Sequence, residues 1–181
     1  DSQFITDDME DTARQVISIV CRQLPLFSDV SVTPDIARVT DNSKVTDHHA
    51  ILPTVQLEKQ DLSALPQSEQ KILNLVGMRL LCATSEKHTY AETQITLSCE
   101  SYTFKTKGKT VIQNGWKAIE ELFKASLKTK EKDDPMKSLP EVHEGDVLDS
   151  VSASVTEHFT TPPKQYTEDT LLSAMETAGN D

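Results

Sequence analysis

The sequence has few aromatic residues, few cysteines and no long apolar run, and each shortage excludes a class of protein. Aromatic residues make up 5% of the 181 positions, so a single compact core built on aromatic anchors is not expected. No apolar run approaches the roughly 18 residues of a membrane-spanning helix, and the first residues lack the basic and apolar regions of a signal peptide. Cys21, Cys82 and Cys99 are odd in number and far apart, which predicts reduced thiols packed in a cytosolic protein.

A glycine-rich phosphate loop is also missing, so no nucleotide partner is expected. The net charge of −11 argues against a surface that binds nucleic acid throughout. One segment, from Lys105 to Lys132, departs from this balance, since it holds eight lysines against three acids. This segment is either a solvated face or a track for DNA phosphates, and the sequence leaves both readings open.

Two stretches have the 3.6-residue period of an amphipathic helix. The first runs from Thr6 to about Leu24; Thr6 can cap it, acids fill its first turn, and Pro25 ends it. The second runs from Pro66 to about Thr84. The apolar residues expected to face the core are Ala13, Val16, Ile17, Val20 and Leu24 in the first helix, and Ile72, Leu75, Val76, Leu80 and Ala83 in the second.

After His88 the period changes from 3.6 to 2, which is typical of β-strands. Residues 91–99 alternate between apolar and polar and predict a half-buried strand. Residues 102–106 predict a second strand, 107–109 a turn, and 110–112 a third strand. Between the two helices, the sequence predicts loops and connectors, with one short helical turn from Pro34 to Arg38.

The last third of the chain alternates between loops and short elements. A turn at 114–115 leads to a helix over 116–127, and the charged segment 128–139 predicts a flexible loop. A turn at Gly145-Asp146 leads to a strand, whose apolar residues are Val147, Val151, Ala153 and Val155.

The prolines of residues 160–166 predict an extended segment before a final helix. Thr167 is expected to cap this helix and Gly179 to close it. Its residues expected to face inward are Leu171, Leu172 and Met175.

The chain's densest cluster of charged, hydroxyl and imidazole side chains lies between Ser43 and Thr54. This stretch reads Ser-Lys-Val-Thr-Asp-His-His-Ala-Ile-Leu-Pro-Thr. Lys44 can meet a phosphate as a point charge, while Ser43 and Thr46 can donate hydrogen bonds to its oxygens. An imidazole held against Asp47 would add a positive charge nearby. The apolar residues 50–52 are expected to anchor these groups to a core.

This stretch closely resembles the Ser-Lys-Val-Thr-Asp-His-His-Ala-Ile-x-Pro-Thr signature of type IA DNA topoisomerases, in particular the bacterial topoisomerase III-like branch. A second stretch, residues 160–168, matches another motif of that family. The opening Asp1-Ser2 resembles the end of the family's Tyr-x-Arg-Thr-Asp-Ser motif. The resemblance therefore implies an internal fragment that starts just after the catalytic tyrosine, so that the nucleophile is absent.

The resemblance implies an α+β fold, in which a helical part of the tyrosine-bearing domain is followed by an antiparallel β arch with interspersed helices. The mainly helical remainder of the tyrosine-bearing domain would be residues 1–88. The arch, or gate, would comprise 89–113 and 140–163. Helices of the neighbouring domain would be 114–127 and 167–179.

The implied activity is that of an ATP-independent enzyme that cuts one DNA strand, holds it as a 5′-phosphotyrosine, passes another strand and reseals. The fragment alone is expected to be inactive. His48 would support catalysis beside the scissile strand, and the implied DNA-binding residues are Ser43, Lys44, Thr46, His48 and Arg79. Mg²⁺ would serve the whole enzyme but bind outside this chain, which has no expected metal site. The implied partner is single-stranded DNA, without membrane or nucleotide, in the cytoplasm with the nucleoid.

Two alternatives remain. Asp47-His48-His49 spells the motif of Asp-His-His metal-dependent phosphoesterases, but that chemistry needs further carboxylates around two metal ions and an apolar strand before the motif. The chain could also be a non-catalytic DNA-binding module, which differs only in what precedes it.

Overall fold

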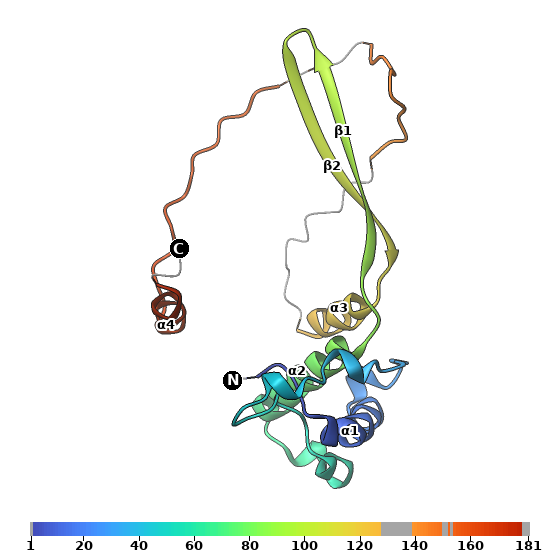
Figure 1. Ribbon diagram of the computed structural model, residues 1–181, viewed down its shortest axis with the longest axis vertical. Helices are drawn as coiled ribbons and strands as arrows, with labels where there is room; N and C mark the ends of the chain where they lie inside the picture. The colour runs from blue at the N-terminus through green and yellow to red at the C-terminus, as the bar shows by residue number, and fades with distance from the viewer. Residues whose placement is uncertain (1, 128–138, 150–151, 153, 179–181) are drawn as a thin grey trace. The chain divides into compact units, whose positions relative to one another are not determined.

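A computed structural model describes residues 2–127, 139–149, 152 and 154–178, in two units that comprise Asp1–Pro140 and Glu141–Asp181. The helices and strands of the described residues are α1 (Glu10–Gln23), α2 (Gln67–Thr84), β1 (Thr89–Cys99), β2 (Tyr102–Gln113), α3 (Trp116–Ser126) and α4 (Glu168–Thr177) (Figure 1). Short 3₁₀ turns connect them at Asp7–Met9, Pro25–Phe27, Ile36–Arg38, Asn42–Lys44, Val55–Lys59 and Leu62–Ala64. Helices and an antiparallel strand pair in one chain confirm the predicted α+β class.

The apolar stripe predicted for α1 is buried as expected. Its members Ala13, Val16, Ile17, Val20 and Leu24 are all at most 3% exposed. The helix ends where Leu24 turns extended before Pro25. Removing apolar side chains from water is the main favourable term in folding, so this stripe fixes α1 against the rest of the first unit.

The start of α1 differs from the prediction. Thr6 precedes the 3₁₀ turn Asp7–Met9, but its side chain makes no capping hydrogen bond. The Asp7 amide instead donates to Asn42 Oδ1, 2.9 Å away. A side chain from a distant loop therefore satisfies one backbone donor at this helix start, and Thr6 satisfies none through its side chain.

The buried side of α2 is rotated relative to the predicted stripe. Leu80 is buried and Val76 is half-buried, but Ile72, Leu75 and Ala83 are exposed. The buried positions are Gly77, Met78, Leu80, Leu81 and Thr84. Gly77 explains the rotation, because a Cβ there would lie 2.9 Å from Leu24 Cδ1, so α1 packs directly on the α2 backbone.

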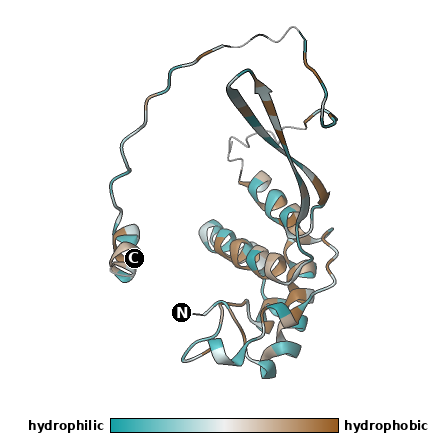
Figure 2. Cartoon of the chain, turned by 45° about the horizontal axis from the view of Figure 1, so that its top comes forward, coloured by the Kyte–Doolittle hydropathy of each residue, from teal (hydrophilic) through white to brown (hydrophobic). Residues whose placement is uncertain are grey.

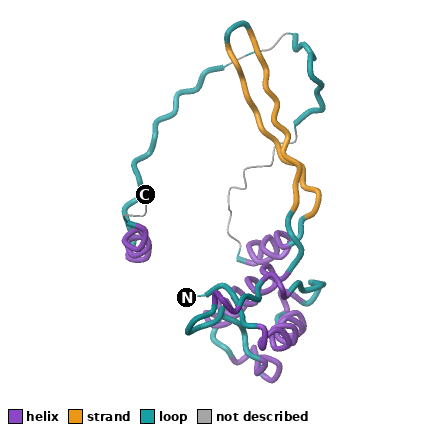
Figure 3. The backbone as a smooth tube through the Cα atoms, in the orientation of Figure 1, coloured by secondary structure: helices purple, strands orange, loops and turns teal. Residues whose placement is uncertain are grey.

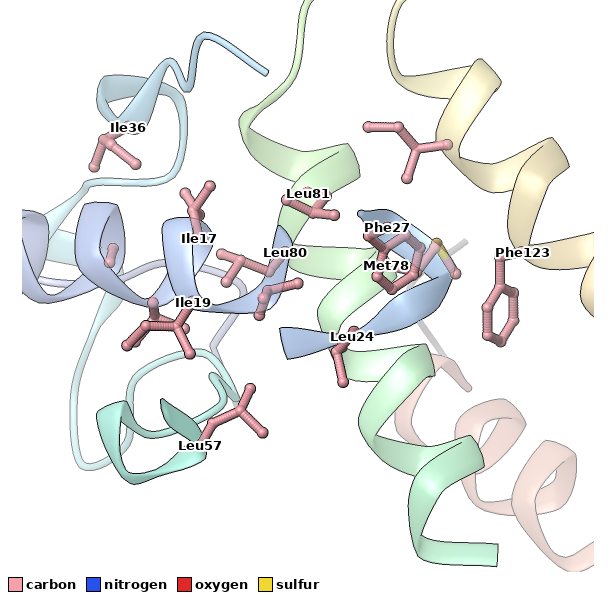
Figure 4. Packing of buried hydrophobic residues seen from close by; sticks show 14 of the residues in the cluster. Ile17, Ile19, Leu24, Phe27, Ile36, Leu57, Met78, Leu80, Leu81 and Phe123 are labelled. Carbon is pink, nitrogen blue, oxygen red and sulfur yellow. The ribbon is translucent and has the colours of Figure 1, made fainter. Parts of the chain in front are cut away.

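The core gathers side chains from the three helices and the 3₁₀ turns (Figure 4). Phe27, in the turn after α1, is fully buried. Ile119 and Phe123 of α3 join the same cluster, and α3 packs against α2. Aliphatic residues dominate the cluster, as the small aromatic content predicted.

One long antiparallel hairpin follows the helical part (Figure 3). β2 is a single strand, so the predicted turn at 107–109 and the separate strand at 110–112 are wrong. Gly108 lies inside the ladder, opposite Thr93. The chain reverses instead at residues 100–101, where Glu100 adopts a φ of +53°, a left-handed conformation that suits a tight hairpin turn.

The predicted half-burial of β1 is also wrong, because of its 11 residues only Ile95 is even partly buried. Hydrophobic residues recur along both strands (Figure 2), yet Leu97, Tyr102 and Phe104 remain exposed. A hairpin of two strands offers its side chains no second layer to pack against.

The two ends of the hairpin are held together where they leave the helices. The Trp116 amide donates to the Glu86 carbonyl oxygen at 2.9 Å, and a ring nitrogen of His88 donates to the Asn114 carbonyl oxygen at 3.1 Å. Gly115 has a φ of +50°, and a Cβ there would come within 2.4 Å of the Lys87 carbonyl oxygen. Glycine is therefore required at this junction.

In the second unit, the described residues form α4 and extended segments. Thr167 caps α4 as predicted, in a reciprocal capping box with Thr170. The predicted strand is wrong at the described positions, because Val147 and Val155 pair with no strand. A strand without a neighbour leaves its backbone groups to water, and no described residue of this unit pairs with these positions. The expected inward-facing residues of α4 are exposed instead: Leu171, Leu172 and Met175.

Some predictions fall outside the described residues. These are the flexible loop over 128–138, the three lysines at its start, the strand positions Val151 and Ala153, and the end of the last helix at Gly179. None of the helices that the structure does describe has the length and apolar character needed to cross a membrane. Cys21 and Cys82 are half-buried free thiols, but Cys99 is exposed at the hairpin tip, so its predicted packing is wrong.

Candidate functional site

The polar residues of the Ser43–Thr54 stretch lie on an exposed loop. Ser43, Lys44 and every residue from Thr46 to His49 are solvent-exposed. The loop follows the 3₁₀ turn Asn42–Lys44 and continues as an extended segment. Its hydroxyls, ammonium and imidazoles are therefore open to a ligand from solution.

Asp41 organises the start of this loop. Its Oδ1 accepts from both the Ser43 amide, at 3.0 Å, and the Ser43 hydroxyl, at 2.6 Å. The Lys44 ammonium lies 3.5 Å from the second carboxylate oxygen. The hydrogen bond from the Ser43 hydroxyl first, then that from the Ser43 amide and the Lys44 charge, hold the pKa of Asp41 below its ordinary value. Asp41 thus positions the two residues expected to meet a phosphate.

The N-terminal segment is tied to the same loop by side chains. Ser2 Oγ donates to the Lys44 carbonyl oxygen at 2.8 Å and accepts from the Phe4 amide at 3.0 Å. The Lys44 ammonium lies 4.4 Å from the centroid of the Phe4 ring, within cation–π range. These contacts hold the Lys44 side chain beside the first residues of the chain.

Backbone pairing strengthens this connection. The Ile5 amide donates to the Val39 carbonyl oxygen, and the Asp41 amide donates back to the Ile5 carbonyl oxygen, at 2.8 and 3.0 Å. The Ala50 amide donates to the Phe4 carbonyl oxygen at 2.8 Å. The N-terminal segment therefore lies between the two ends of the loop, and Ile5 anchors it because it is 1% exposed.

Both histidines of the loop are exposed to solvent. His49 Nδ1 lies 2.6 Å from the Ala50 carbonyl oxygen, so this nitrogen carries the proton and donates. This bond turns the His49 ring toward the backbone of the next residue. His48 is exposed on the same loop, next to Asp47 in sequence.

Arg79 lies on α2, far from the loop in sequence, but lines a cavity of about 410 Å³ with it. Its side chain forms no ion pair or hydrogen bond with a described residue, so its guanidinium is available. The other lining residues include Gln3, Ile5, Ala50, Ile51 and Leu52. The structure thus brings Arg79 close to the loop and the N-terminal segment.

The expected anchoring of the loop is only partly correct. Ala50 and Leu52 are half-buried and pack against the core. Ile51 is 82% exposed, so the prediction that all three residues anchor the loop is wrong for Ile51. In an extended segment neighbouring side chains point to opposite sides, and Ile51 points away from the core.

No three histidine, cysteine, aspartate or glutamate side chains among the described residues gather in a group that could hold a metal ion. Asp47, His48 and His49 follow a polar 3₁₀ turn rather than an apolar strand. The described residues therefore do not fit the Mg²⁺ expected for the whole enzyme or the two-metal centre of an Asp-His-His phosphoesterase.

The residues that support the loop were not predicted from the sequence. Asp41 could have been found, because an aspartate two residues before a serine is a common local turn in which the side chain accepts from the backbone. The contacts of Ser2 and Phe4 connect segments about forty residues apart, and no local pattern predicts them.

Comparison with known proteins gives a consistent result. The family model described as DNA topoisomerase matches residues 1–179. The DNA topoisomerase 3 of Bacillus licheniformis is 39% identical over 136 residues, which are 75% of this chain and 18% of that protein. The DNA topoisomerase 3 of Staphylococcus saprophyticus is 32% identical over 180 residues, 97% of this chain and 24% of that protein.

The chain thus spans about a quarter or less of the length of these relatives. The family match covers nearly all of it, including the signature loop, α2 and the hairpin. The chain belongs to the type IA DNA topoisomerase family, in its topoisomerase III-like branch.

Proposed function

We propose that this chain supplies strand-binding and gate parts of an ATP-independent type IA DNA topoisomerase. The whole enzyme would cleave one DNA strand through a 5′-phosphotyrosine intermediate, pass a second strand through the break and reseal it. A covalent intermediate keeps the energy of the phosphodiester bond, so no nucleotide is required.

One observation carries the proposal: the N-terminal segment is hydrogen-bonded to the signature loop, residues 43–54. Ser2 and Phe4 contact Lys44, and Phe4 also pairs with Ala50 through the backbone. By resemblance to the family, Ser2 is the last residue of the motif that contains the catalytic tyrosine. The same contacts would hold the tyrosine beside the cation that meets the scissile strand.

Each polar residue of the loop would contact DNA in a different way. Lys44 would neutralise a phosphate as a point charge, and Thr46 would donate a hydrogen bond to a phosphate oxygen. Ser43 now donates to Asp41, so its role would begin with a shift of this bond to the strand. His48 would stabilise charge at the scissile phosphate, and Arg79 would hold a neighbouring phosphate.

The remaining features concern the whole enzyme. It would act on single-stranded DNA segments, in the cytoplasm with the nucleoid. Mg²⁺ would assist it from residues outside this chain.

Binding of a labelled single-stranded oligonucleotide, followed by fluorescence anisotropy over a series of salt concentrations, tests the proposal. Lys44→Ala should weaken binding and make the salt dependence shallower by about 0.7 in the slope of log K against log salt, because one phosphate contact is lost. Lys71→Ala is the matched control, since Lys71 is exposed on α2.

A shallower slope for Lys44→Ala, with the control unchanged, supports the strand-binding role of the loop. An unaltered slope in both variants would place Lys44 outside the DNA path. The circular dichroism spectrum of each variant should match that of the unmodified chain, because both lysines are exposed.

A further inference from the structure

We propose that one face of the β1–β2 hairpin is a second binding surface for single-stranded DNA, separate from the signature loop. This inference rests on the proposed function for its substrate, but it depends on different residues. The surface is defined as the lysine face: Lys105, Lys107 and Lys109 of β2, with Tyr90, Glu92 and Gln94 of β1.

The strand register places these residues on one side. Glu92 pairs with Lys109, Gln94 with Lys107 and Thr96 with Lys105, so their side chains share a face of the ladder. The single unbroken β2 is decisive here. The turn predicted at 107–109 would have separated the lysines, whereas a continuous strand aligns all three.

The opposite face of the same ladder carries no charged side chain. This face carries every second residue from Ala91 to Cys99 and from Tyr102 to Thr110. All of these residues are apolar, hydroxyl-bearing or glycine. Every charged residue of the two strands is therefore on the lysine face, with three cations against one acid. This local excess of positive charge contrasts with the net charge of −11 for the chain.

The spacing of the three lysines along β2 suits an extended polyanion. Alternate residues of a strand lie about 7 Å apart, so the three ammonium groups form a row. Phosphates follow one another at about 3.4 Å along a stacked strand, and flexible lysine stems can reach every second one. Lys105 makes no ion pair with a described residue and is exposed, which leaves its charge for a phosphate.

An aromatic ring stands at the base of the row. The Lys109 ammonium lies 4.3 Å from the centroid of the Tyr90 ring, and this ring is tilted against His88 at 5.6 Å. Tyr90 is 43% exposed. A cationic track beside an exposed aromatic ring is the arrangement that binds unpaired strands, because bases can stack on the ring while lysines follow the backbone. A duplex, whose bases are already stacked, would not use Tyr90.

Glu92 provides an internal test. Its two carboxylate oxygens lie 3.2 Å from the Lys107 ammonium and 3.9 Å from that of Lys109. It would compete with phosphate for both lysines. Replacing it by the neutral Gln should therefore tighten DNA binding, whereas a purely structural ion pair would give no gain in affinity.

The test is anisotropy of a labelled oligothymidylate with the whole chain across a salt series. The triple variant is Lys105→Gln/Lys107→Gln/Lys109→Gln. Its slope of log K against log salt should be shallower by about 2, since each contact with a single strand contributes about 0.7. The charge-matched control is Lys59→Gln/Lys71→Gln/Lys164→Gln, at exposed positions that belong to neither strand of the hairpin. Glu92→Gln should bind more tightly. Tyr90→Ala should bind about tenfold more weakly, while Tyr90→Phe keeps the ring and should restore binding.

The outcomes separate this inference from the proposed function. If Lys44→Ala weakens binding while the triple hairpin variant does not, the lysine face is not a DNA surface and the loop proposal stands. If the triple variant alone weakens binding, the hairpin inference stands and the loop proposal fails. Equal affinity for duplex together with no effect of Tyr90→Ala would overturn the assignment to single strands. The complete absence of binding would overturn the inference.

Discussion

The helical part and the hairpin of the first unit show two ways in which an amphipathic pattern is used. In α1 the apolar stripe is almost fully buried against α2 and the turns around it. In β1 of the hairpin the alternation is just as regular, yet only Ile95 of its residues is even partly buried. A periodic pattern thus predicts which side chains share a face, but not whether the chain supplies a partner for that face.

The largest expected effect contrasts two phenylalanines. Phe27→Ala should lower the free energy of unfolding by about 3–5 kcal/mol, because it empties a fully buried site. Phe104→Ala should cost less than about 1 kcal/mol, since that ring is 55% exposed on the hairpin. Urea denaturation followed by circular dichroism measures both. Equal losses would show that the hairpin is packed as tightly as the helices.

A smaller effect is expected at the junction between the two regions. Gly115→Ala forces a side chain into a left-handed backbone position and against the Lys87 carbonyl oxygen, at a cost of about 1–3 kcal/mol. Amide hydrogen exchange should show lost protection at the Trp116 amide, with α1 unchanged.

Gly145→Ala is the control, because Gly145 has a φ of +93° but open space around it. It carries the backbone strain without the clash. If Gly115→Ala leaves the Trp116 amide as protected as before, the close approach at the junction does not hold the hairpin base.

The smallest effect concerns thiol reactivity. Burial, and to a lesser degree the charge of Glu120, raise the pKa of Cys82 to about 11, so at pH 8 this thiol remains protonated. Only thiolates react readily with alkylating agents. Cys99, exposed at the hairpin tip, should therefore react at least about tenfold faster than Cys82. Mass spectrometry of timed iodoacetamide labelling measures the two rates, and equal rates would contradict the burial of Cys82.

The sequence predicted those features that local patterns determine. The α1 stripe, the bounds of α2 and the cap of α4 at Thr167 follow from periodicity, proline placement and capping chemistry. The buried side of α2 was displaced because close packing at Gly77 decides it, and that contact involves a different helix. The hairpin turn was misplaced because Gly108 suggested a turn, whereas Glu100 forms it without a typical turn residue.

The candidate site shows the same limit. The signature predicts Lys44 and His48 as residues that would carry the chemistry, since dense polar groups in one short stretch are visible in sequence. The contacts of Ser2 were not predicted, because they arise when distant segments meet. The local bond from Ser43 to Asp41 was missed although its spacing is visible in the sequence. The lysine face was visible only as an excess of charge until the register placed its members on one side.

The role of the signature loop is tested most directly by single-turnover cleavage and resealing of a single-stranded oligonucleotide, with the whole topoisomerase that contains this segment. His48→Ala should slow both steps by about 10²-fold, in line with the loss of one group that stabilises charge at the reacting centre. His143→Ala, at an exposed position of the second unit, should leave both rates unchanged. Unchanged rates in His48→Ala, with the protein folded and DNA bound, would contradict the proposed role of His48.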